Sequence, residues 1–101
     1  MIMKSNYLNL IGLANRAGKC STGEETIIKD IKSERAKLVL LANDMGPRTR
    51  KKLTDKCKSH NVAYEEADDS ETLSHAIGKH KRVAVAILDA GFANKIKSLL
   101  G

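Results

Sequence analysis

Hydrophobic residues recur along the chain in two alternating patterns, one continuous and one with the spacing of a helix. Two aliphatic runs, AKLVLLA at 36–42 and VAVAIL at 83–88, have the length of strands that are buried on both faces. Elsewhere the apolar residues return every third or fourth position, which is typical of amphipathic helices. The chain is therefore predicted to alternate between helices and strands.

Turn residues mark the ends of several predicted elements. Gly18 and Gly78 are expected to stop helices, Pro47 suits the first turn of another, and Asp68 and Asp69 are expected to cap a helix start. In chain order we predict a helix over 4–18, a short strand over 19–22, a helix over 23–34, a strand over 36–42, a helix that begins near Pro47 and includes Lys58, a strand over 61–67, a helix over 68–78, a strand over 83–88 and a helix over 91–100.

The predicted helices each turn an apolar face inward, and these faces supply the expected core. The short connections favour an α/β fold in one domain over residues 1–101, with helices on both sides of a sheet, although the pattern leaves the strand order open. The inward positions are Tyr7, Leu10, Ile11, Ala14, Ile27, Ile28, Ile31, Leu53, Cys57, Leu73, Ala76, Ile77, Phe92, Ile96 and Leu99.

The charge is strongly basic and unevenly distributed. The 101 residues include 18 Lys and Arg against 12 Asp and Glu, a formal net charge of +6. Residues 61–74 nevertheless hold five acidic residues and no basic one. Such segregation favours a nucleic-acid face opposite a solvated one, although solubility alone also explains a basic balance.

Membrane-spanning runs, signal segments and cysteine pairs bear on the cellular compartment in which we expect the protein. No apolar run approaches the roughly 20 residues that span a bilayer, and the N-terminus does not have the pattern of a signal peptide. Cys20 and Cys57 form no metal or redox motif and are expected to be reduced, while a disulfide between them stays open. We therefore expect a cytoplasmic protein with no membrane association.

Motifs that would carry catalysis do not match. GLANRAGKCS at 12–21 has five residues between Gly12 and Gly18 where a P-loop has four, and a helix precedes it. Cys57 and His60, or His75 and His80, lack further ligands at zinc-like spacing. We expect no enzyme, no catalytic residue, no metal and no cofactor.

The segment STGEETIIK at 21–29 places two adjacent glutamates at a predicted helix start. Neighbouring side chains on a helix point about 100° apart, so Glu24 and Glu25 do not flank one bond as a catalytic pair. Ser21 with Glu24, and Thr22 with Glu25, match the capping-box pattern. We therefore interpret Glu24 as a cap, at a helix start whose free N–H groups also suit phosphate.

The segment GKHKRV at 78–83 is a predicted loop with four successive basic or imidazole side chains, Lys79 to Arg82. Binding residues concentrate on loops that a rigid scaffold holds. The chain has only three aromatic residues, so base stacking on a sheet is not expected. Recognition by polar side chains, backbone groups and basic loops is the better expectation.

Two long segments carry a family resemblance. AGKCSTGEETIIKDIKSERAKLVLLANDMGP at 17–47 and ETLSHAIGKHKRVAVAILDAG at 71–91 resemble the kink-turn RNA-binding ribosomal proteins of the L7Ae and L30e types. The small bacterial YlxQ-type members are the most similar, since they share the IGLANRAGK opening and the AIGKHKRV loop. The resemblance implies a three-layer α/β/α sandwich around a mixed four-stranded sheet.

The resemblance also implies a partner and a site. In the family, RNA is held by the helix start that corresponds to Gly23–Lys29 and by the loop that corresponds to Gly78–Val83, with the ANDMGP loop as an additional candidate. We expect a monomer that binds structured RNA, either ribosomal RNA or the ribosome. In these two regions the expected RNA-binding residues are Gly23, Glu24, Glu25, Thr26, Lys29, Lys79, Lys81 and Arg82. We expect Arg16 and Lys19 to make additional phosphate contacts.

The sequence departs from the family pattern at two of these positions. Glu25 stands where Asn or Lys is usual, and Thr26 where Glu or Gln is usual. An ionised carboxylate only accepts hydrogen bonds, so Glu25 suits a guanine N–H but repels a close phosphate. Binding of structured RNA, ribosomal or otherwise kink-turn-like, is still expected on this face, while the recognition of standard kink-turns stays open. The alternative is a protein-interaction module of translation or ribosome assembly that uses the acidic stretch Glu65–Glu71.

Overall fold

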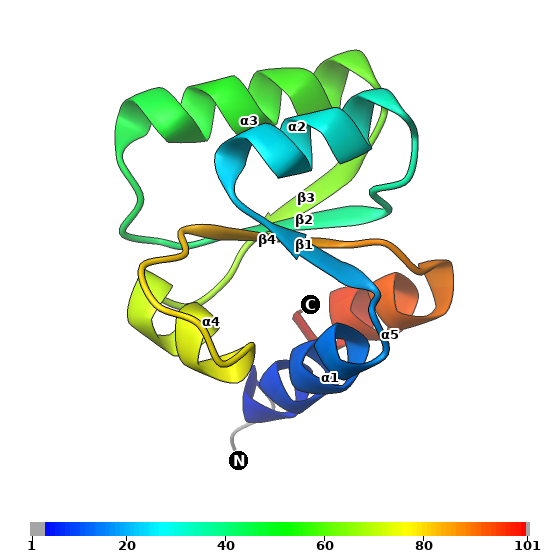
Figure 1. Ribbon diagram of the computed structural model, residues 1–101, viewed down its shortest axis with the longest axis vertical. Coiled ribbons are helices and arrows are strands. Elements are labelled where there is room, and N and C mark those ends of the chain that lie inside the picture. The colour runs from blue at the N-terminus through cyan, green and yellow to red at the C-terminus, as the bar shows by residue number, and fades with distance from the viewer. Residues whose placement is uncertain (1–3, 101) are drawn as a thin grey trace.

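The computed structural model describes residues 4–100, over which helices and strands alternate as the hydrophobic pattern predicts (Figure 1). The strands are one to three residues shorter than predicted, although backbone hydrogen bonds still join the ends of the predicted runs, such as the Ala42 N–H to the Val83 carbonyl. In order, the elements are α1 (Lys4–Arg16), β1 (Cys20–Thr22), α2 (Glu24–Lys32), β2 (Leu38–Leu41), α3 (Pro47–Ser59), β3 (Ala63–Glu66), α4 (Ser70–Ala76), β4 (Ala84–Ile87) and α5 (Ala90–Leu100).

The four strands form one mixed sheet in the order β1-β4-β2-β3. β4 pairs antiparallel with both β1 and β2, whereas β2 and β3 are parallel. Every residue of the two central strands is buried, which accounts for their continuous aliphatic sequences, while β1 and β3 are edge strands and are partly exposed. This order places the start of β4 beside the end of β1.

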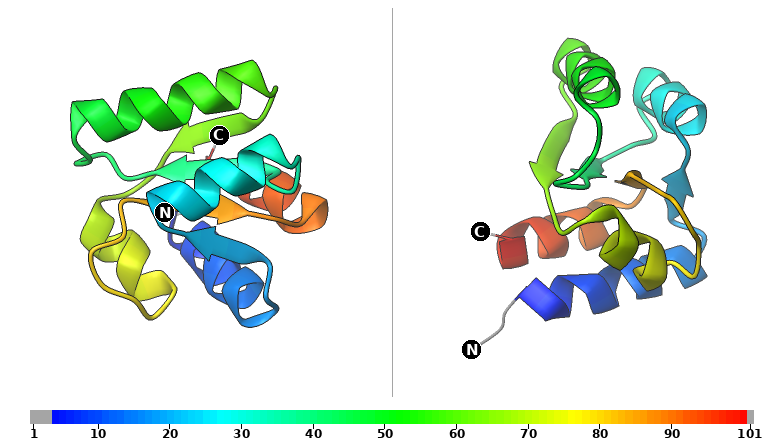
Figure 2. Two further views of the ribbon diagram at one scale, coloured as in Figure 1. Left: turned by 45° about the horizontal axis from the view of Figure 1, so that its top comes forward. Right: turned by 90° about the vertical axis from the view of Figure 1, so that its left-hand side faces the viewer.

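Helices cover both faces of the sheet, which confirms the predicted three-layer α/β/α sandwich. α2 and α3 lie on one face, and α1, α4 and α5 lie on the other (Figures 1 and 2). Side chains from all three layers are fully buried, among them Tyr7, Ile31, Leu53, Leu73 and Ile96. Within the described residues, no helix combines the length and apolar character needed to cross a membrane.

The turn residues act as their sequence predicts. Gly18 and Gly78 have φ of 73° and 66° just beyond α1 and α4, a region that favours glycine. Pro47 begins α3, and the side chain of Asp69 caps α4 by accepting the Thr72 N–H at 2.7 Å. Because α1 continues through Gly12 to Arg16 and β1 begins at Cys20, the segment with a partial P-loop pattern is divided between a helix end, a turn and a strand, and forms no phosphate loop.

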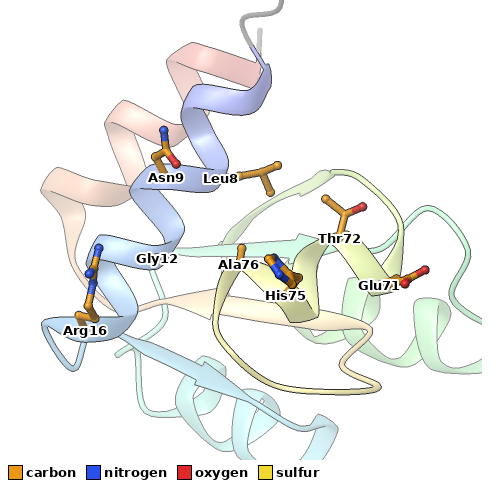
Figure 3. Close-up of a pocket in the computed structure, with 8 residues that line it drawn as sticks. All are labelled: Leu8, Asn9, Gly12, Arg16, Glu71, Thr72, His75 and Ala76. Carbon is orange, nitrogen blue, oxygen red and sulfur yellow. The ribbon is translucent and has the colours of Figure 1, made fainter.

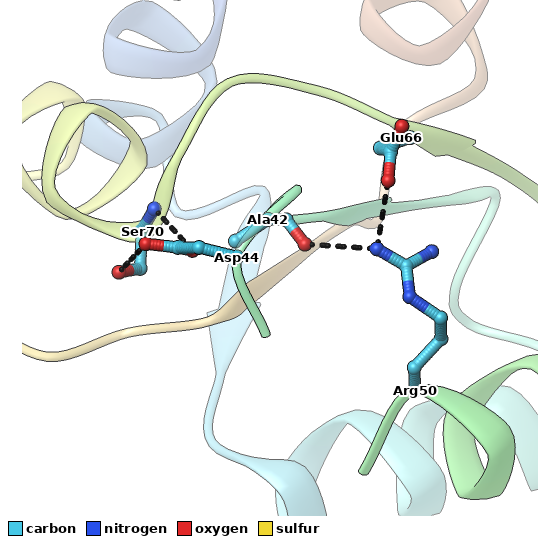
Figure 4. Close-up of polar contacts among 5 residues, drawn as sticks. All are labelled: Ala42, Asp44, Arg50, Glu66 and Ser70. Carbon is cyan, nitrogen blue, oxygen red and sulfur yellow. Dashed lines mark hydrogen bonds and ion pairs between the residues drawn. The ribbon is translucent and has the colours of Figure 1, made fainter. Parts of the chain in front are cut away.

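Polar contacts connect the layers around the acidic stretch. Tyr7 Oη donates to Asp68 Oδ2 at 2.6 Å and accepts the Asp68 N–H at 3.0 Å, which joins α1 to the loop before α4. Asp44 accepts from both the N–H and the hydroxyl of Ser70, and an Arg50 Nη2 donates to Glu66 (Figure 4). Most acids of the stretch therefore have structural partners.

Both cysteines are free thiols. Cys57 is fully buried on the inward face of α3, as predicted, and Cys20 on β1 is half-buried. Burial raises the pKa of each thiol to about 11, so both are protonated near neutral pH. Neither has the environment of a reactive cysteine.

Candidate functional site

The N-terminus of α2 opens from a glycine turn. Gly23 is the N-cap residue and has φ 91°, which L side chains rarely adopt. Its carbonyl accepts the Ile27 N–H at 2.9 Å, but a glycine has no side chain with which to cap the first-turn N–H groups. These N–H groups give the helix start a partial positive charge that suits an anion.

The capping box predicted for this helix is wrong. Ser21 and Thr22 belong to β1, where they pair with Ala86 and Val85 of β4, and the helix begins only at Glu24. Neither hydroxyl therefore occupies the N-cap position. The hydroxyl oxygen of Ser21 is buried and has no hydrogen-bond partner among the described residues.

Glu24 does not act as a cap but joins α2 to α3. Its Oε2 lies 2.7 Å from Lys52 Nζ on the second turn of α3. This hydrogen bond lowers the pKa of the Glu24 carboxyl and raises the pKa of the Lys52 ammonium. No local pattern predicts this pair, because its members are 28 positions apart and meet only after both helices pack on the sheet.

Glu25, Thr26 and Lys29 are exposed at the beginning of α2. None of their side chains forms a hydrogen bond or ion pair with another residue in the described part of the chain. Lys29 follows Glu25 by one helical turn, so the two lie on the same outer side of the helix. The helix start thus presents a carboxylate, a hydroxyl and an ammonium group to the solvent.

The basic loop between α4 and β4 is held against the body of the protein by Ser74. The buried Ser74 hydroxyl accepts the Arg82 N–H at 2.7 Å and donates to the Arg82 carbonyl at 3.1 Å. Lys81 has φ 57°, an unusual value for a residue with a side chain. Ser74 is not among the residues that the sequence predicts for the site, since a serine on a short helix carries no signal of such a role.

This loop and the α2 N-terminus converge. Arg82 Nη1 would lie 3.9 Å from a Cβ placed on Gly23, and Arg82 Nε is buried without a hydrogen-bond partner among the described residues. A pocket of about 220 Å³ lies between the two segments and has an apolar floor from α3 and β4. It is lined by Gly23, Glu24, Leu53, Lys81, Arg82, Val83 and Ala84.

A more open hollow continues from this pocket around the helix start. It is lined by Thr22, Gly23, Glu24, Glu25, Thr26 and Arg82. The structure therefore brings together most of the predicted site residues from the two segments. Lys79 lies on the other side of the loop, in a hollow that it shares with His75, His80 and Lys81.

Arg16 and Lys19 lie apart from this cluster. The Lys19 carbonyl accepts the Leu88 N–H, which places Lys19 beyond the far end of β4. Leu88 is six residues from Arg82, which corresponds to about 20 Å in an extended chain. Arg16 is exposed at one end of a groove between α1 and α4, to which Gly12 and His75 contribute (Figure 3). The structure does not join these two cations to the α2 N-terminus.

A metal site and a binding surface on the acidic stretch have little support among the described residues. Within residues 4–100, no group of three or more His, Cys, Asp or Glu side chains is placed to hold a metal ion. The acidic stretch offers few free carboxylates, because Glu66, Asp68 and Asp69 have the structural partners described above. The convergence of the α2 N-terminus with the basic loop is the main candidate.

Comparison with known proteins identifies relatives along almost the whole chain. The family described as "Ribosomal protein L7Ae/L30e/S12e/Gadd45 family" matches residues 5–97. A relative from Bacillus subtilis, named RNA-binding protein YlxQ, is 52% identical over 94 residues, which cover 93% of this chain and 94% of the relative. The protein of the same name from Enterococcus faecium is 46% identical over 97 residues, which cover 96% and 93%.

A solved structure has the same fold. A Bacillus halodurans protein of unknown function superposes with a TM-score of 0.90 at 41% identity, covering 93% of this chain and 95% of that protein. The similarity thus extends over the full sandwich, including both segments that form the candidate site.

Proposed function

This chain belongs to the ribosomal protein L7Ae/L30e/S12e/Gadd45 family, and we propose that it binds structured RNA, without catalysis, through the α2 N-terminus and the loop before β4. The observation that carries the proposal is the convergence of these two segments on one pocket. Two relatives that match nearly the whole chain are named RNA-binding proteins, and the net charge of +6 suits a polyanion.

Each part of the pocket suits a different part of RNA. The N–H groups of the α2 first turn and the Arg82 guanidinium are donors for phosphate oxygens. Leu53 and Ala84 are buried, so half-buried Val83 is the apolar lining residue that would contact an unstacked base, and unstacked bases are what proteins commonly read in RNA. An RNA with a sharp bend or an internal loop supplies both features at one place.

The identity of Glu25 bears on which RNA this is. We propose a kink-turn-like element, in ribosomal or another RNA, in which Glu25 accepts from a guanine N–H and Thr26 and Lys29 contact the neighbouring backbone. An ionised carboxylate has no proton to donate, so a motif that needs a donor at this position would bind poorly. Lys79 and Lys81 would add phosphate contacts, whereas Arg16 and Lys19 would meet only an RNA that extends past the far end of β1.

A salt titration tests the proposal. We expect the affinity of a structured RNA, first total cellular RNA and then a synthetic kink-turn hairpin, to fall steeply with salt, with a slope of about −0.7 to −0.9 in log K against log salt for each phosphate contact. Flat salt dependence, or no shift of any RNA at low salt, would contradict it and favour a protein partner.

Substitutions in the basic loop separate two roles for its cations. Lys81→Ala and Arg82→Ala should weaken binding to all RNAs alike if these side chains contact phosphates. Lys97→Ala is the matched control, because Lys97 is exposed on α5, across the sheet from α2. A loss confined to particular sequences would instead assign Lys81 or Arg82 to base recognition. Crosslinking in cells, followed by sequencing of the bound RNA, would identify the target.

A further inference from the structure

A second basic surface adjoins the proposed site along the outer sides of α2 and α3. The two helices lie side by side on one face of the sheet and run in the same direction (Figures 1 and 2). The Glu24–Lys52 ion pair fixes their relative position near their first turns. Any row of side chains that follows this pair toward the C-termini therefore starts at the α2 N-terminus.

Helical periodicity places two lysines along this row. Lys56 follows Lys52 by four residues, a rotation of only about 40°, so it stays on the side of α3 that faces α2. Lys32 lies eight residues after Glu24, about 12 Å along the helix axis and rotated by about 80°, which turns it outward from the seam between the helices. Lys32 and Lys56, together with Lys29 at the start, define the α2/α3 ridge.

The ridge carries uncompensated positive charge. Within the described residues, the ion pairs of α3 involve Arg50, Lys51 and Lys52. Lys29, Lys32 and Lys56 take part in none of the ion pairs found in that part of the chain. Lys29 and Lys32 are exposed and Lys56 is half-buried, so their ammonium groups can meet an external anion at the cost of hydration and side-chain freedom.

The chemistry of the ridge distinguishes among polyanions. Protein interfaces usually centre on apolar and aromatic residues, but the exposed large hydrophobic residue of the described chain is Leu13, on α1 across the sheet. Single-stranded nucleic acid is held by stacking on aromatic side chains, and the helical segments α2 and α3 contain none. Lysines without apolar or aromatic neighbours suit the backbone of a duplex, which is contacted mainly through phosphates.

We propose that the α2/α3 ridge supports a helical stem of the same RNA whose bent or looped part occupies the α2 N-terminus, with Lys32 and Lys56 each contacting a phosphate. The inference rests on the proposed function and extends it to a second part of the RNA. It gives the protein an orientation on its target, because the stem must leave the pocket along α2 and not across the basic loop.

The test combines protein variants with RNA length. The probes are a synthetic kink-turn hairpin with long stems and two versions in which one stem or the other is cut back to the base pairs next to the turn. On the long RNA, the double variant Lys32→Ala, Lys56→Ala should make the salt slope less negative by about 1.4–1.8, or 0.7–0.9 for each lost contact. On the RNA that lacks the supported stem, this variant and the unaltered protein should have equal slopes.

Lys58→Ala is the matched control on α3. Lys58 is exposed like Lys29 and Lys32, but it is six residues from Lys52 and therefore rotated by about 240°, onto the flank away from α2. It should leave the slope unchanged on every RNA. Circular dichroism spectra of all variants would verify that the helices are intact.

The outcomes separate this inference from the proposed function. If the unaltered protein binds none of the hairpins at low salt, the proposed kink-turn function fails and the ridge inference fails with it. If the protein binds, three results would each show that the RNA stem does not lie on the ridge. The ridge variant could have the wild-type salt slope, its slope could change as much on each trimmed RNA as on the long one, or its slope could equal that of Lys58→Ala. Binding of the pocket to RNA would then stand alone.

Discussion

The contact between Ser74 and Arg82 makes a quantitative prediction about how the loop before β4 is held. Ser74→Ala removes the hydroxyl that accepts the Arg82 N–H at 2.7 Å and donates to the Arg82 carbonyl at 3.1 Å. Each such hydrogen bond contributes about 0.5–1.5 kcal/mol net, so the two together should contribute about 1–3 kcal/mol. The side chain is 3% exposed, so water has little access to replace the hydroxyl.

The loss of these two hydrogen bonds in Ser74→Ala should lower both the stability of the fold and the order of the loop. Urea denaturation should show a free energy of unfolding lower by about 1–3 kcal/mol. Amide hydrogen exchange at Arg82 should be faster, because its N–H loses its acceptor. RNA affinity should fall by up to about tenfold, in proportion to the fraction of molecules in which the loop leaves its binding conformation.

Ser98→Ala is the control for removing a serine hydroxyl from a helix. Ser98 donates to the Lys95 carbonyl at 3.3 Å on the exposed side of α5, and its loss should change stability by less than about 0.5 kcal/mol. If Ser74→Ala behaves like Ser98→Ala in unfolding and leaves exchange at Arg82 unchanged, Ser74 does not hold the loop.

Three further predictions concern Glu25, Tyr7 and the two cysteines. Glu25→Asn should raise the affinity for a standard kink-turn hairpin, whereas Glu25→Asp, which keeps the charge, should not. Equal effects of the two substitutions on affinity would show that the charge of Glu25 does not select the RNA. Tyr7→Phe removes a donor to Asp68 and an acceptor for its N–H, and urea denaturation should report a loss of about 1–3 kcal/mol; no loss would mean that the phenol does not secure α1. Burial raises the pKa of the Cys20 and Cys57 thiols from 9.0 to about 11, so their contribution to stability is complete below pH 9 and is lost as pH rises toward 11. At pH 8 both thiols should react slowly with a disulfide reagent in the native protein and quickly in urea. Fast reaction of the native protein would contradict the burial.

The sequence by itself determined the type and order of the elements, and their ends to within about two residues, because these depend on residues close to one another in the chain. Helical and continuous apolar spacing identified all nine elements of residues 4–100, and glycines such as Gly18 and Gly78 marked helix ends through backbone conformation alone. The alternation and short connections already favoured helices on both sides of a sheet, whereas the mixed four-stranded sheet came from the family resemblance, since local pattern carries no information on strand order.

The tertiary structure decided what each charged residue does. Glu24 matched a local capping pattern, but the sheet order places α2 beside α3, and Lys52 became its partner. Ser74 gained its role because α4 packs next to the start of β4. Arg16 and Lys19, near the site in sequence, ended at the far end of β1. A charge interacts with whatever lies within a few ångströms, and only the folded arrangement of helices on the sheet sets those neighbours.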